Sequence, residues 1–195
     1  IQDWTGRLYA ELDYTDLAAW QRWFDYPLEI HSGKGGVRLW LAFSGKQFTE
    51  ATADVALAKV SARLARQLPV LELDYLEGRL GGKQMRDGFE IFGKKLSLRT
   101  GGGVALPPAD FAVRWGRGSA SQPPSGELQA NALELQPLAH LGEFLPFPQV
   151  VRRQLSAIEL RGSLFDLKFS WTGDPDRLEQ YSVRGRFANL GARAL

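Results

Sequence analysis

The stretch RLWLAFSG, from Arg38 to Gly45, is followed 128 positions later by DLKFSWTG, from Asp166 to Gly173. In both stretches, apolar residues alternate with polar or small ones, and the run ends in a hydroxyl residue and a glycine. Alternation with a period of two is typical of a β-strand with one apolar face, and the Ser-Gly or Thr-Gly ending is typical of a turn. The near-repetition predicts two copies of one structural module.

The repeat extends beyond this strand. GELQA at 126–130 matches GRLYA at 6–10, an offset of 120, and FANL at 187–190 matches LAKV at 57–60, an offset of 130. A short helical segment follows the first matching strand in each copy, and it covers 17–24 in the first copy. The offset rises along the chain, as it does in a true repeat with small insertions, and such modules stack along one axis. We predict a first copy over 1–60, connecting strands with a Pro/Gly loop over 61–125, and a second copy over 126–195, with one continuous domain as the alternative.

Period-two alternation continues between the copies. It is clear at 70–75, and 76–80 continues it with shifted parity, which indicates a β-bulge. The segments 89–91 and 96–98 predict a hairpin around Gly93. With a further short helix expected over 148–155, the chain is predicted to be mainly antiparallel β with two or three short helices.

Composition and charge exclude several classes of protein. The 195 residues are 44% hydrophobic and 24% charged, which is ordinary for a folded domain, and the formal net charge of +2 is too small to indicate nucleic-acid binding. There is no cysteine, so disulfides and thiol chemistry are excluded. No apolar run is long enough to span a bilayer. The chain begins at Ile1, inside a strand-like segment, and we expect it to be part of a longer protein.

No motif for catalysis, metal binding or cofactor binding is found. The two histidines, His31 and His140, lie in no metal-ligand or triad spacing. The glycine-rich segment 32–36 lacks the spacing of a phosphate loop and precedes a strand, so a hairpin turn explains it better. Asp13 and Asp16 are explained by capping of the following helix. We therefore assign no catalytic residue, no metal ligand and no cofactor.

The chain is rich in strands with one strongly apolar face. Alternation alone does not distinguish a closed core from a curved sheet whose concave face stays open as a groove, and on this ground alone the closed core is favoured. If the groove is open, alternation and repeat equivalence select its lining. The candidate residues are Leu39, Leu41, Phe43, Val55, Leu57, Leu167, Phe169, Trp171, Val183 and Phe187.

The second copy resembles a known family. The segments GSLFDL at 162–167, WTG at 171–173 and YSVRGRFANL at 181–190, with Leu145-Pro146 before them, resemble the central region of the YhdP proteins. These belong to the AsmA-like group of Gram-negative envelope proteins. The resemblance covers most of the chain and includes no catalytic signature. One departure is Arg161, where the family pattern has proline.

The resemblance implies a fold and a role. The fold would be a curved, repeating β-groove. The whole protein would be anchored in the inner membrane by a segment outside this chain, would cross the periplasm and would move phospholipid towards the outer membrane, in contact with outer-membrane or other envelope proteins. No enzyme activity, cofactor or nucleic acid is implied. A scaffolding module with a closed core is the main alternative, and a glycan-active enzyme is a more distant one.

Overall fold

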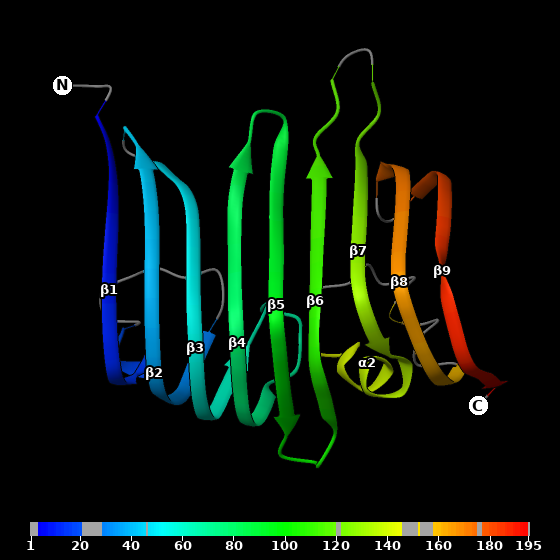
Figure 1. The fold of residues 1–195 in the computed structure, drawn as a ribbon, viewed down its shortest axis with the longest axis horizontal. Helices are drawn as coiled ribbons and strands as arrows, with labels where there is room; N and C mark the ends of the chain where they lie inside the picture. The colour runs from blue at the N-terminus through cyan, green and yellow to red at the C-terminus, as the bar shows by residue number, and fades with distance from the viewer. Residues whose placement is uncertain are drawn as a thin grey trace.

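The structure, a computed structural model, describes residues 4–20, 29–45, 47–119, 122–145, 152, 158–174 and 177–194. In this part of the chain, nine strands form one sheet in which each strand pairs antiparallel with its neighbours in sequence (Figure 1). The elements are β1 (Thr5–Asp16), α1 (Leu17–Trp20), β2 (Glu29–Ser44), β3 (Gln47–Arg63), β4 (Leu71–Met85), β5 (Gly88–Thr100), β6 (Ala105–Gly116), β7 (Ser125–Glu134), α2 (Leu135–Leu141), β8 (Ile158–Asp174) and β9 (Arg177–Ala194). The predicted mainly antiparallel β fold, with its short helices, is confirmed.

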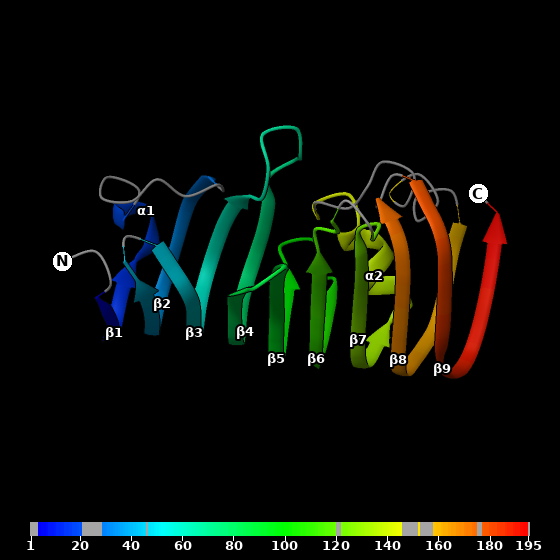
Figure 2. The same cartoon turned by 90° about the horizontal axis from the view of Figure 1, so that it is seen from above.

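The sheet is open and curved, and both helices lie on its concave side (Figure 2). β8 and β9 show the bend most clearly, because both of their ends turn towards the side of the helices. Four non-glycine residues within strands have a left-handed backbone, with φ of 48–52° at Lys59, Lys95, Asp166 and Asn189. Such residues are typical of β-bulges, and bulges bend strands.

One sequence prediction about the middle of the chain is wrong. Residues 89–91 and 96–98 do not form a hairpin around Gly93, because β5 runs unbroken from Gly88 to Thr100. The left-handed conformation at Lys95 and register shifts on both sides of β5 replace the predicted turn. The glycine and lysines that suggested a turn therefore mark a bulge.

Repeat-equivalent positions share backbone features. Lys59 and Asn189, which the sequence comparison places at the same position, both have φ of 52°. The N–H of Gly45 donates to the carbonyl of Trp4 at 2.8 Å, and the N–H of Gly173 donates to the carbonyl of Pro124 at 2.8 Å. The strands of the two copies, β1–β3 and β7–β9, lie in series along one sheet rather than face to face.

The strand ends form two long sides of the sheet, and the two sides differ in packing. The turns after β4 and β6 lie on one, here called the hairpin side, and α1 and α2 lie on the other, here called the helix side (Figure 1). A compact cluster on the helix side includes Val60, Leu73 and Leu98 from the sheet and Leu141 from α2, each at most 7% exposed. Among the described residues, no large side chain is less than 2% exposed. Among the described residues, the sheet therefore has a hydrophobic core along the helix side, and this core does not extend to the hairpin side.

Parts of the helix predictions lie outside the described residues. The first helix, expected over 17–24, is described as α1 up to Trp20. The helix expected over 148–155 lies outside the described residues, apart from Arg152. The domain boundaries proposed from the sequence remain a prediction.

Candidate functional site: an open apolar groove

An unbroken row of apolar residues crosses the concave face of the sheet. Residues that are directly opposite in antiparallel strands share a face, so the register traces the row from strand to strand. We call it the groove row: Leu8, Leu41, Ala51, Gly82, Ile91, Val113, Leu128, Phe169 and Val183. A second apolar row lies beside it, towards the helix side: Ala10, Leu39, Ala53, Leu80, Gly93, Phe111, Ala130 and Leu167. No member of either row is charged.

The groove row lies at the surface. Leu8, Ile91 and Val183 are each 50% exposed, so the row is accessible at both ends and in the middle. Members of the second row, nearer the helices, include buried residues such as Ala130 and Leu167. The concave face is therefore closed on the helix side, around Ala130 and Leu167, and open on the hairpin side, around Leu8, Ile91 and Val183. We call the closed part the floor of the groove and the open apolar part its wall. An exposed apolar patch of this extent marks a binding site or an interface.

The structure places most of the sequence-selected residues on this concave face. Leu39, Leu41, Leu167, Phe169 and Val183 belong to the two rows. Phe43, Val55 and Trp171 continue the same alternation on their strands. Phe187 lies four residues after Val183 on β9, on the same face, and is 55% exposed. Leu57 is 5% exposed and belongs to the helix-side core, so the open wall does not include it.

Aromatic residues border the groove on the hairpin side. The register joins Phe89, Trp115, Gly126, Trp171 and Tyr181, which we call the rim row. The rings of Trp115 and Trp171 lie 5.7 Å apart, and Phe169 stacks on Trp171 at 5.2 Å. Sequence reasoning identified Trp171 in this row, and Phe169 beside it, but missed Phe89 and Trp115, because their strands lie outside the repeat and were not aligned with it.

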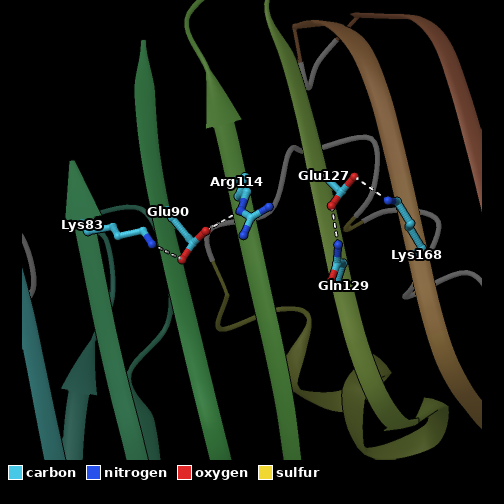
Figure 3. A network of polar contacts seen from close by, with 6 residues as sticks. All are labelled: Lys83, Glu90, Arg114, Glu127, Gln129 and Lys168. Carbon is cyan, nitrogen blue, oxygen red and sulfur yellow. Dashed lines mark hydrogen bonds and ion pairs between the residues drawn. The ribbon is translucent and has the colours of Figure 1, made fainter. Parts of the chain in front are cut away.

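The opposite, convex face is polar and carries cross-strand ion pairs (Figure 3). Glu90, whose side chain is 8% exposed, lies between Lys83 on β4 and Arg114 on β6 and pairs with both. The hydrogen bond from Arg114 and that from Lys83 hold the pKa of the Glu90 carboxyl below its ordinary value, although burial acts in the opposite direction. Further along, Lys168 pairs with Glu127 at 3.1 Å.

The same pattern continues towards β1. Arg79 donates two hydrogen bonds to Asp54, and Arg38 pairs with Glu11 at 2.7 Å. Tyr9 and Arg38 both donate to Glu11, and these bonds lower the pKa of the Glu11 carboxyl. Opposite charges directly across a strand pair stabilise one register over another. The convex face thus favours the register in which the concave rows are continuous.

The described residues include no cluster of three or more histidine, aspartate or glutamate side chains placed to hold a metal ion. His31 lies exposed on β2, and His140 on α2 bonds through Nδ1 to the carbonyl of Gln136 at 2.9 Å. Within the same residues, no helix is long and apolar enough to cross a bilayer.

The fold and the groove define a class of protein: a single-layer, repeating β-groove with one apolar and one charged face. The family model described as YhdP protein matches residues 1–194, so the chain belongs to the YhdP family. Membership makes it part of an envelope protein of the lipid-transport type. No curated protein and no solved structure matches the chain.

Proposed function

We propose that this chain shelters phospholipid acyl chains in its open concave groove and supports phospholipid movement from the inner to the outer membrane. The observation that carries the proposal is the groove row, which is apolar on all nine strands and uncharged throughout. Removal of an acyl chain from water is favourable by about 0.8 kcal/mol for each buried methylene. An uncharged, continuous wall supplies that shelter without a covalent step, so the proposal needs no catalytic residue and no cofactor.

The dimensions of the groove suit this role. Nine strands give eight interstrand steps of about 4.8 Å, so the groove row is about 38 Å long. One leaflet of a bilayer has a hydrocarbon thickness of about 15 Å, half of the roughly 30 Å core. The groove row is therefore more than twice as long as one acyl chain. The open ends at β1 and β9 would allow the groove to continue into neighbouring parts of a longer protein.

The proposal places the chain in the periplasm, as part of a protein anchored in the inner membrane through a segment outside this sequence and in contact with outer-membrane or other envelope proteins. The alternative is a scaffolding module with a closed core. The helix-side cluster around Leu73 and Leu141 supports that alternative for one half of the concave face. The exposure of Leu8, Ile91 and Val183 supports the groove for the other half.

The test is site-specific photo-crosslinking in the full-length protein in cells. A photoreactive residue replaces Ile91 or Val183 on the concave face, and Arg184 or Gln129 on the convex face serves as the exposed control. We expect covalent phospholipid adducts at 91 and 183 and none at 184 and 129. Absence of adducts at all four positions in a folded, expressed protein would contradict the proposal and favour the scaffold.

A further inference from the structure

We propose that a lipid in this groove lies with its phosphate at the centre of the hairpin side, held by Arg86 and Arg117, and with its acyl chains directed towards the helices. The inference rests on the proposed function and adds the orientation of the lipid and the residues that bind its headgroup.

An apolar core occupies the helix side of the concave face. The core there is formed by Val60, Leu71, Leu98 and Leu141, each at most 7% exposed, and α2 and α1 pack over it. A charged phosphate placed in this core would be buried among apolar side chains, which is strongly unfavourable. Arg63, at the end of β3 on this side, is already paired with Glu29 at 3.1 Å. The open wall on the hairpin side is therefore the more favourable place for the headgroup.

The depth of the open wall fits an acyl chain that enters from the hairpin side. Phe89 in the rim row and Gly93 in the second apolar row are four residues apart on β5. At about 3.3 Å per residue this distance is about 13 Å, close to the roughly 15 Å thickness of one leaflet. A chain that starts at the rim would thus end near the closed floor.

Aromatic rings occupy the level at which the ester groups of such a lipid would lie. Phe89 is 39% exposed and Tyr181 is 70% exposed, so the rim row is open to solvent. Aromatic side chains with a polar atom, such as tyrosine and tryptophan, favour the boundary between an apolar phase and water. Trp115 and Tyr181 supply such atoms, whereas the groove row below them supplies none and the indole nitrogen of Trp171 is buried.

Two arginines lie beyond this aromatic level. Arg86 occupies the turn between β4 and β5, and the backbone N–H of Arg117, just after β6, donates to the carbonyl of Asp87 at 2.8 Å. Both arginine side chains are exposed, and neither forms an ion pair with a described residue. On the convex face, by contrast, arginines such as Arg79 and Arg114 pair with carboxylates.

The arrangement is complementary to one kind of amphiphile. Arginine binds phosphate through paired N–H donors, and two arginines outweigh the single opposing charge of Asp87. The order of the groups matches that of a glycerophospholipid. The arginines at the hairpin side correspond to the phosphate, the aromatic rings of the rim row to the ester groups, and the uncharged wall to the acyl chains.

Two phosphatidylglycerol probes test the orientation on the purified chain. One carries a diazirine on the headgroup and the other carries it at the end of an acyl chain, and labelled peptides are mapped by mass spectrometry after irradiation. We expect the headgroup probe to label residues 85–89 and 115–117 and the chain-end probe to label the two apolar rows. If the chain-end probe labels the two apolar rows but the headgroup probe labels the helix side, the proposed orientation of the lipid is wrong and the proposed function stands. Labelling of the concave face by neither probe would overturn the proposed function as well.

A charge-matched pair of variants tests the two arginines. We expect the double variant Arg86→Ala, Arg117→Ala to retain about threefold to tenfold less phosphatidylglycerol after incubation with vesicles, since exposed charge contacts are individually modest. The control, Arg66→Ala with Arg184→Ala, removes the same charge away from the hairpin side and should retain lipid normally. Equal retention by the two double variants would overturn the role of the arginines. Binding of glycerol phosphate alone as tightly as the lipid would assign the site to a soluble phosphate instead.

Discussion

Gly126 lies directly opposite Trp171, and a Cβ built on Gly126 would come within 2.1 Å of the indole ring. The first copy has the same relationship between Gly6 and Phe43, where the distance is 2.3 Å. In both pairs an aromatic ring packs over the backbone of a glycine on the neighbouring strand, an arrangement that helps to fix the register of designed sheets as well. The repeat therefore conserves a packing contact between its copies as well as a sequence pattern.

This contact predicts that Gly126→Ala destabilises the chain by about 1–3 kcal/mol, because the added methyl group displaces the indole and its stacking partner. The free energy of unfolding in urea measures the effect. Gly82→Ala is the control, since a Cβ there would meet only the carbonyl of Glu90, at 3.4 Å. An equal loss in the two variants would show that strand propensity, and not the indole contact, causes the effect.

The two halves of the concave face should respond differently to substitution. Ile91 is 50% exposed, so Ile91→Asp should lower the free energy of unfolding by less than about 1 kcal/mol while it reduces lipid binding. Leu73 is 5% exposed in the helix-side core, and Leu73→Ala should cost about 2–5 kcal/mol. Urea denaturation and vesicle binding provide the two readouts. If Ile91→Asp unfolds the chain, the wall is a closed core.

The buried carboxylate on the convex face predicts a dependence of stability on pH. Because the folded-state pKa of Glu90 is lowered, its contribution to stability is fully present above the ordinary glutamate value of about 4.5 and is lost as the pH falls through the folded-state pKa. Glu90→Gln should therefore cost about 1–3 kcal/mol at pH 7, and the difference from the unchanged chain should shrink below about pH 4.5.

Glu179→Gln serves as its control, because Glu179 is exposed on β9 and forms no ion pair with a described residue. We expect this variant to follow the unchanged chain at every pH. A Glu90→Gln difference that persists undiminished at pH 3 would indicate lost packing rather than lost charge pairing.

Alternation and the internal repeat were sufficient to predict the antiparallel fold and a shared apolar face for residues such as Phe169 and Val183, whereas the curved groove was implied by the family resemblance. They were insufficient where the backbone breaks the period-two pattern. Around Gly93, the polar and glycine residues of a bulge have the same composition as a hairpin turn, and only the pairing of β5 with both neighbours distinguishes the two. The burial of Leu57 could not be predicted either, because the alternation of a strand does not specify which part of that strand a helix will cover.

The bulge on β5 predicts that glycine substitutions at two adjacent lysines, Lys95 and Lys94, have different effects on stability. Lys95 has φ of 48°, a conformation in which a side chain costs about 1 kcal/mol and glycine does not. Its backbone N–H donates to Asp110 at 2.7 Å, a bond that any residue can keep. Lys95→Gly should therefore leave the free energy of unfolding unchanged or raise it by up to about 1 kcal/mol.

Lys94 provides the matched comparison, because it is also exposed, it pairs with Arg79 and its φ is not positive. Lys94→Gly should destabilise the chain by about 0.5–1 kcal/mol, since glycine loses more conformational entropy in a strand. Both changes remove one exposed lysine, so the difference between the two unfolding free energies isolates the backbone. If Lys95→Gly destabilises as much as Lys94→Gly, the left-handed conformation at residue 95 costs the lysine nothing, and the loss of backbone entropy decides both variants.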